Sequence, residues 1–241
     1  MKFENTHVYN MESALRGMRF PMQSEDKSDS GYSGIEYIIG EKDLALAQKL
    51  IKAGSTHRKF LRQILVSVEI TAPLYLWKEF DQYKVGTVTN SESTMHRLAT
   101  TPITIDCFET DNYEPTLSFE AGIDDRGDNP WDYDLCIADA IGDYETNYYF
   151  GETYIGFLES LRQKYLETKD IRYWRELIRW LPESWLQKRA VTMNYETLFA
   201  ICSKDQRRNH KLTEWSESFI NWARSLPYAQ EFLFIDEVQN D

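Results

Sequence analysis

The chain has 241 residues, of which 42% are hydrophobic and 14% aromatic, so it can bury a sizeable core and general disorder is excluded. No apolar run approaches the roughly 20 residues that span a bilayer, and no membrane partner is expected. Its three cysteines, Cys107, Cys136 and Cys202, show no CxxC spacing. This argues against a disulfide framework or a thiolate zinc site and predicts a reducing, cytoplasmic location.

The net charge of −12 is concentrated in one part of the chain. An acidic window at Asp106–Glu145 holds 13 acidic residues and one basic residue, Arg126, while the rest is balanced at 26 against 26. This window is not expected to face a phosphate, and a nucleic-acid partner is not expected. A phosphorylated ligand elsewhere is compatible with the charge. The Asp124–Asp134 stretch lacks the register and closing Glu of a calcium loop, so no metal site is predicted.

The rest of the sequence predicts strands interrupted by long helices. A polar, Ser- and Gly-containing stretch, Gln23–Gly34, is predicted to be a mobile loop. The elements expected after it are a strand at Glu36–Gly40, a helix from Glu41 that stops at Gly54, a strand at Ile64–Thr71, a helix at Leu74–Gln82, helices at Thr153–Asp170 and Ile171–Leu181, a strand at Lys188–Asn194, and helices at Tyr195–Lys204 and Thr213–Leu226. This order predicts one α+β domain over residues 1–241, with a central antiparallel or mixed sheet and the acidic window as an insertion.

Basic residues gather at a few points where a phosphate could bind. Arg16 and Arg19 bracket a glycine, and His57 stands beside two further cations. His210 follows a pair of arginines, and His96 closes a hydroxyl-rich run that begins at Thr87. Arginines near flexible backbone can fork onto a phosphate, although a capped turn with surface salt bridges explains the same pattern. No Ser-His-Asp order, HExxH, GxGxxG or GxxxxGK[ST] motif is present.

Two blocks of the chain resemble the flavin-dependent thymidylate synthases of the ThyX type. His57–Thr87 is similar to the family's core, in which a His precedes a strand, Ala-Pro opens a helix, and Arg-His-Arg-x-x-Ser and Asn-Glu-x-Ser follow. Leu181–Ile201 is similar to the family's Leu-Pro, strand, Asn and helix passage. Arg207–Trp215 resembles the start of its last long helix, and Ala14–Arg19 stands where Ala-Arg-x-Ser is expected.

The departures from the family pattern fall on the residues that bind charge. Gln82-Tyr83-Lys84 replaces Arg-His-Arg, and Thr87 takes the serine position. Asn90-Ser91-Glu92-Ser93 is one residue longer than its counterpart, and Glu196 aligns with a family arginine. A lost charge-assisted hydrogen bond costs about 1.5–3 kcal/mol, so two losses weaken a phosphate site roughly a hundredfold or more. Lys84 restores one charge without the planar fork.

The resemblance implies a set of ligands, an assembly and a site. It implies FAD as cofactor, with NADPH and a methylene folate, and the conversion of dUMP to dTMP or a related pyrimidine alkylation. It also implies a homotetramer with active sites between subunits. The implied flavin-site residues are His57, Tyr83, Lys84 and Thr87, and the implied nucleotide-site residues are Arg16, Arg19, Asn90, Glu92, Ser93, Arg179, Asn194 and Arg207.

Two other interpretations stay open. The chain could keep the scaffold without catalysis and act as a nucleotide-binding or partner-binding sensor, sponge or inhibitor. The altered Arg-His-Arg element and the acidic window favour that interpretation. The second is an unrelated cytosolic α+β protein whose alignment with the ThyX-type family is accidental.

Overall fold

The computed structural model describes residues 1–110 and 144–237, and the side chains of 1–110, 154–204 and 206–237. Most of the acidic window, including Asp124–Asp134, therefore lies outside the described residues. The chain forms two compact units, Met1–Glu92 with Gln187–Asp241, and Ser93–Leu186. The prediction of one domain over residues 1–241 stays a prediction. No helix among the described residues is long and apolar enough to cross a membrane.

A four-stranded sheet in the order β1-β4-β6-β5 is the centre of the first unit. The strands are β1 (Lys2–Tyr9), β4 (Leu65–Pro73), β5 (Val88–Ser91) and β6 (Leu186–Asn194), with a separate hairpin of β2 (Gly31–Ser33) and β3 (Glu36–Ile38). β1 pairs antiparallel with β4, and β5 antiparallel with β6. This confirms the predicted α+β class and the strands expected at Ile64 and Lys188.

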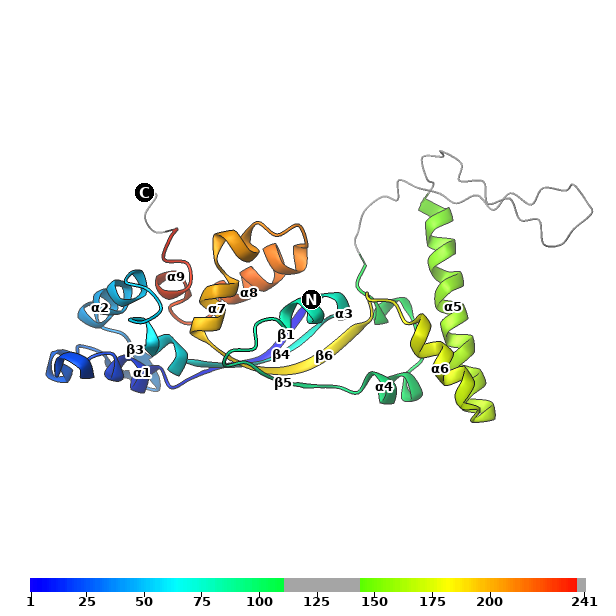
Figure 1. The fold of residues 1–241 in the computed structure, drawn as a ribbon, viewed down its shortest axis with the longest axis horizontal. Coiled ribbons are helices and arrows are strands. Elements are labelled where there is room, and N and C mark those ends of the chain that lie inside the picture. The colour runs from blue at the N-terminus through cyan, green and yellow to red at the C-terminus, as the bar shows by residue number, and fades with distance from the viewer. Residues whose placement is uncertain (111–143, 238–241) are drawn as a thin grey trace, which may run out of the picture. The chain divides into compact units, whose positions relative to one another are not determined.

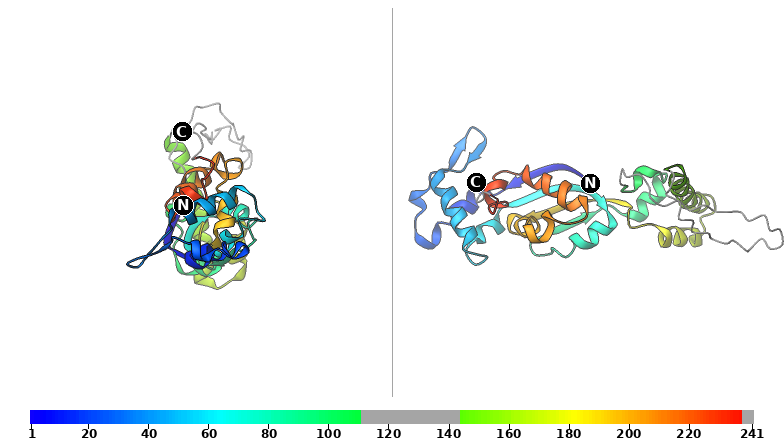
Figure 2. Two further views of the ribbon diagram at one scale, coloured as in Figure 1. Left: turned by 90° about the vertical axis from the view of Figure 1, so that its left-hand side faces the viewer. Right: turned by 90° about the horizontal axis from the view of Figure 1, so that it is seen from above.

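Helices cover one face of this sheet (Figures 1 and 2). The helical segments of the unit are α1 (Met11–Gly17), η1 (Phe20–Met22), η2 (Glu25–Lys27), α2 (Glu41–Lys52), η3 (Lys59–Gln63), α3 (Leu74–Phe80), α7 (Tyr195–Ile201), η5 (Lys204–Arg208), η6 (Glu214–Phe219), α8 (Ile220–Arg224) and α9 (Ala229–Phe232). Along β4, Val66, Val68 and Ile70 are buried while the residues between them are only partly exposed. The sheet therefore has an apolar face under the helices and a polar face.

Aromatic rings fill the space between the sheet and the helices. Phe80 of α3 stacks on Trp215 of η6 at 6.1 Å between ring centroids, and Trp215 lies 5.2 Å from Phe219. At the other side, Phe3 of β1 stacks on Trp222 of α8 at 4.8 Å. These rings, buried except for the partly buried Phe3, supply much of the core and connect the first strand to the C-terminal helices.

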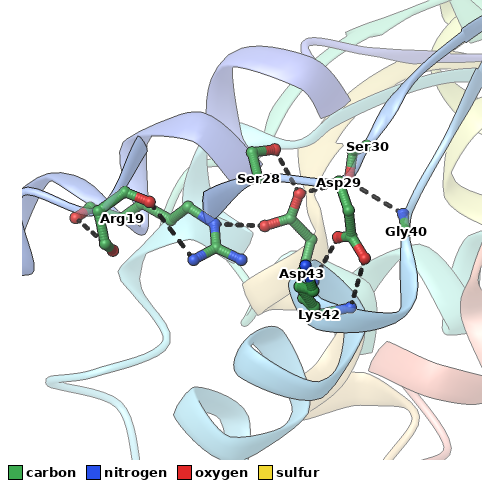
Figure 3. A network of polar contacts seen from close by, with 8 residues as sticks. Arg19, Ser28, Asp29, Ser30, Gly40, Lys42 and Asp43 are labelled. Carbon is green, nitrogen blue, oxygen red and sulfur yellow. Dashed lines mark hydrogen bonds and ion pairs between the residues drawn. The ribbon is translucent and has the colours of Figure 1, made fainter. Parts of the chain in front are cut away.

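A buried ion pair fastens the stretch predicted to be a mobile loop. Arg19 Nε lies 2.5 Å from Asp43 Oδ1, and the hydroxyls of Ser28 and Ser30 donate to Asp43 Oδ2 (Figure 3). Burial alone would raise the pKa of Asp43, but the hydrogen bonds from Ser28, Ser30 and Arg19 lower it overall. Asp29 accepts from the amide of Asp43 at the start of α2. Gln23–Gly34 accordingly contains η2 and β2, held against α2 by polar contacts.

The second unit is helical. It contains α4 (Thr94–Thr100), η4 (Ile105–Cys107), α5 (Tyr144–Thr168) and α6 (Ile171–Trp180). The end of α5 and both ends of α6 agree with the predicted helices within two residues. α5 begins at Tyr144, earlier than the predicted start at Thr153. α4 was not predicted, although Ser93 caps it by accepting from the amide of His96.

Candidate functional site

The start of α7 organises the residues of the two family-like blocks. Asn194, the last residue of β6, caps the helix by accepting from the amide of Thr197 at 2.9 Å. The Thr197 hydroxyl then donates to the carbonyl oxygen of Val85 at 2.7 Å. Asn194 and Thr197 are both buried, so these bonds hold the turn after α3 against the end of β6.

That turn contains a glycine that no other residue could replace without strain. Gly86 has φ +71°, and a Cβ on it would lie 2.1 Å from Asn194 Nδ2. The close approach brings the backbone of the turn onto the capping amide. Lys84 is exposed in the same turn, while the Thr87 hydroxyl is buried and makes no hydrogen bond within residues 1–110 and 144–237.

Arg207 lies against Tyr83 at this turn. Its guanidinium carbon is 5.3 Å from the centroid of the Tyr83 ring and 4.8 Å from that of Trp215. Nη2 is 2.9 Å from Glu79 Oε1, whereas Nε is buried and has no hydrogen-bond partner among the described residues. Burial raises the pKa of Tyr83, with Arg207 opposing the shift, so the phenol stays protonated at neutral pH.

Glu79 joins three groups, among them Arg207, and no sequence pattern singled it out. Besides the guanidinium, it accepts from Trp215 Nε1 at 3.2 Å and lies 3.6 Å from His210 Nε2. His210 Nδ1 accepts from the amide of Leu212, which leaves Nε2 turned toward the carboxylate. Glu79 lies in the last turn of α3, and Tyr83 follows in the turn after that helix.

The basic residues at His57 also include one that contacts α7, Arg58. His57 is exposed in the turn after α2. Its neighbour Arg58 donates from Nε to both carboxylate oxygens of Glu196, at 3.1 and 2.9 Å, and lies 4.4 Å from the ring centroid of Phe199. Glu196 thus stands where the resemblance expects an arginine and neutralises an arginine from the other block.

The remaining predicted site residues of the first unit are Arg16, Arg19, Asn90 and Glu92. Asn90 is exposed on β5 opposite Ala190, and Glu92 accepts from the amide of Lys188 at 3.0 Å. Arg16 is exposed at the end of α1, with no ion pair among the described residues. Arg19 is engaged by Asp43, as described above.

Two predicted residues belong to the second unit. Ser93 caps α4, and Arg179 is exposed on α6, where Nη1 lies 2.5 Å from Glu176 Oε1. The structure therefore brings Tyr83, Thr87, Asn194 and Arg207 to one turn, and places His57 at a turn before the η3 segment that packs on α7. The assignment of all these residues to a ligand stays a prediction.

Chemically, the Tyr83 cluster (Glu79, Tyr83, Thr87, Asn194 and Arg207) suits an anionic ligand that accepts hydrogen bonds. It offers a guanidinium N–H and a hydroxyl that no described residue pairs with. A thiolate nucleophile is not available from the nearby core, because burial raises the pKa of Cys202 to about 12. Among the described residues, no group of three His, Cys, Asp or Glu side chains could hold a metal ion.

Comparison with known proteins identifies the fold. No family model and no curated protein matches the sequence. Among solved structures, the flavin-dependent thymidylate synthase ThyX of Helicobacter pylori, solved with FAD and dUMP, covers 98% of this chain and 99% of its own, with TM-score 0.64 and 17% identity. The chain has a ThyX-like fold.

A second ThyX-like structure is similar to the same degree. PolB of Streptomyces cacaoi, a UMP/dUMP methylase solved with 5-Br dUMP, covers 97% of this chain and 95% of its own, with TM-score 0.60 and 15% identity. The predicted ThyX-like fold is confirmed over nearly the whole length of both proteins. At this level of identity, the likeness concerns the fold, and the ligands belong to those proteins.

Proposed function

We propose that this chain binds a pyrimidine nucleotide and FAD at the Tyr83 cluster, and that it methylates dUMP or a related pyrimidine. The observation that carries the proposal is the pair of unused buried polar groups, Arg207 Nε and Thr87 Oγ1, around one turn. A buried polar group without a partner costs about 1–3 kcal/mol, which a bound ligand would recover. The dUMP and 5-Br dUMP complexes of the two ThyX-like proteins support the class of ligand.

The residues present fit FAD in part. The Thr87 hydroxyl and the exposed Lys84 can bind FAD and its diphosphate, together with Tyr83 and His57. When bound, the flavin would supply the hydride chemistry, and the protein would orient the pyrimidine against it. NADPH as reductant and a methylene folate as one-carbon donor follow from the resemblance alone, as does a cytoplasmic location.

The nucleotide would be held by Arg207 and Asn194 at the cluster, with Asn90, Glu92 and Arg16 as further contacts. Arg207 would donate from Nε while Glu79 holds the Nη2 side of the same guanidinium. Tyr83 and Trp215 would keep the guanidinium plane in place through their ring faces. Ser93 and Arg179 stay proposed nucleotide contacts in the second unit, and Arg19 stays one in the first.

A specific observation favours the second candidate, a ThyX-like nucleotide-binding protein without catalysis. Two arginines near α7 are neutralised internally, Arg207 by Glu79 and Arg58 by Glu196, and Gln82 is neutral. A phosphate at this site would therefore meet less net positive charge than two free guanidinium forks provide. Such a protein would act as a sensor, sponge or inhibitor.

The first experiment is an absorption spectrum of the purified protein near 450 nm, followed by calorimetric titration with dUMP. Bound flavin and a dUMP-dependent oxidation of NADPH are expected from the enzyme. Nucleotide binding without that oxidation would assign the second candidate. A colourless protein that binds neither FAD nor any pyrimidine nucleotide would refute both.

Two substitutions locate the site. Arg207→Gln should weaken dUMP binding about tenfold or more, because one charge-assisted hydrogen bond is lost, whereas Arg175→Gln on exposed α6 should not. Thr87→Val should weaken FAD binding without lowering the unfolding midpoint, because the fold does not use this hydroxyl. Unchanged affinities in both site variants would move the site elsewhere.

A further inference from the structure

A cavity of about 450 Å³ lies between η5, α8 and the chain after α9. Three cationic side chains line it, Lys204, Arg208 and Arg224, and three neutral hydrogen-bonding side chains, Asn209, Ser216 and Asn221. It is separate from the Tyr83 cluster, because Arg208 turns to Phe234 while its neighbour Arg207 turns to Tyr83.

Two arginines in this cavity are fixed before any ligand arrives. The guanidinium carbon of Arg224 lies 4.1 Å from the ring centroid of Phe234, and that of Arg208 lies 5.7 Å from it. Phe234 is fully buried, so it gives both cations a rigid support. The Arg208 side chain is only 10% exposed, and its buried Nε has no hydrogen-bond partner in the part of the chain that the structure describes.

The chain places its own anion between these arginines. The Glu237 carboxylate accepts from Arg208 Nη1 at 2.7 Å and from Nη1 and Nη2 of Arg224, both at 2.8 Å. These bonds, chiefly those from Arg224, lower the pKa of Glu237 to about 2 against the effect of burial. The arrangement therefore favours an oxyanion at this point.

The internal carboxylates can leave without disturbing the core. Asp236, which pairs with Arg208, and Glu237 have side chains that are 50% and 32% exposed. The segment itself is anchored by the buried side chains of Phe234 and Ile235. A rotation of two side chains would raise the charge of the lining from +1 to +3, since Lys204, Arg208 and Arg224 stay in place.

We propose that this cavity is a binding site for a phosphate monoester, whose phosphate replaces the Glu237 carboxylate between Arg208 and Arg224. A phosphate carries a charge of about −1.5 to −2 and three acceptor oxygens, so it can accept from both arginines and from Lys204. The guanidinium fork matches the geometry of carboxylate and phosphate alike. Asn209, Ser216 and Asn221 would contact the rest of the molecule, and the volume admits a small phosphorylated metabolite.

The local backbone is also of a kind that recurs at functional sites. η5 and η6, which contribute Lys204, Arg208 and Ser216, are π-helical. π-Helical turns are rare and frequently occur at functional sites. The proposal does not depend on the proposed nucleotide and flavin site, because none of its residues belongs to the Tyr83 cluster.

Calorimetric titration with inorganic phosphate, at constant ionic strength and neutral pH, tests the site. Glu237→Gln should bind phosphate about tenfold or more tightly than the unchanged chain, because the competing charged acceptor is gone. Glu231→Gln, which removes the same charge from α9, should bind like the unchanged chain. Adding Arg224→Gln to Glu237→Gln should abolish the gain.

Three results would overturn the proposal. One is equal phosphate affinity for Glu237→Gln and the unchanged chain, and another is an equal gain with Glu231→Gln. The third is equal binding of acetate and phosphate by Glu237→Gln, which would assign a carboxylate ligand instead.

A second measurement applies if Glu237→Gln does not fold. Inorganic phosphate should then raise the unfolding midpoint of the unchanged chain and of Arg175→Gln, but not that of Arg224→Gln. An equal rise in all three proteins, or no rise in any of them, would refute the site.

Discussion

At the scale of single residues, unused polar atoms mark both proposed sites. Of the four buried side-chain polar atoms without a hydrogen bond among the described residues, three belong to Thr87, Arg207 and Arg208. The fourth is the indole nitrogen of Trp185. Natural folds pair nearly all such atoms, and the two proposals assign the three in Thr87, Arg207 and Arg208 to ligands.

Gly86 shows how one backbone position supports the Tyr83 cluster. Gly86→Ala should lower the free energy of unfolding by about 3 kcal/mol, because it adds both a left-handed strain and a clash with Asn194. Gly34→Ala is the matched control, with φ +65° and no atom near its Cβ, and should cost about 1 kcal/mol. Urea denaturation of both variants measures the difference. Equal losses would mean that the turn moves freely away from Asn194.

At the scale of elements, η5 presents two consecutive arginines to different partners. Arg207 contacts η6 and the turn after α3, while Arg208 contacts the segment after α9. A five-residue π-helical segment can do this because its residues radiate around the axis, so neighbours in sequence point apart. The two proposed sites therefore share one short element without sharing a side chain.

The Arg19–Asp43 pair fastens η2 and β2 to α2 (Figure 3). Asp43→Asn should cost about 3 kcal/mol, because it leaves the buried guanidinium of Arg19 uncompensated. It should also speed hydrogen exchange and proteolysis in Gln23–Gly34. Asp26→Asn, an exposed residue of the same stretch, is the control and should change neither. An Asp43→Asn variant that is as stable and as protected as the unchanged chain would contradict this account.

At the scale of the whole molecule, the ThyX-like fold persists at 14–17% identity to the solved structures. The fold depends on the burial of an apolar sheet face and an aromatic core, which many sequences satisfy. Ligand binding depends on individual charged groups, and several of these differ from the family pattern at Gln82, Lys84 and Glu196. Fold and activity therefore have to be tested separately.

The proposed assembly is a homotetramer, which follows from the resemblance. Mass photometry of the purified protein should give a mass of about four chains, because family sites are completed by neighbouring subunits. The measurement is repeated after addition of FAD. A strict monomer under both conditions would contradict FAD binding in the family's manner, while leaving the Arg208–Arg224 cavity untouched.

Local patterns were enough to predict most of the central elements. β4 was predictable because buried and partly exposed residues alternate along most of it. The same holds for the end of β6, where Val191 and Met193 are buried on either side of Thr192, and α2 was predictable because its apolar face ends at Gly54. β1 was not predicted, because its register shifts between Glu4 and His7 and this breaks the alternation of buried and exposed residues. β5 was not predicted, because all four of its residues are exposed and give no alternating pattern.

By itself, the sequence determined the α+β class, the ThyX-like order of elements, and the substitutions at Gln82-Tyr83-Lys84. Only the tertiary structure decided which arginines form ion pairs within the fold: Arg19 with Asp43, Arg58 with Glu196, and Arg207, through Nη2, with Glu79. It also decided that Arg208 and Arg224 meet Glu237 at one cavity. The physical reason is that periodicity is a local property of the chain. The ion pair of Arg58 and Glu196 joins residues 138 positions apart, and only packing brings them together.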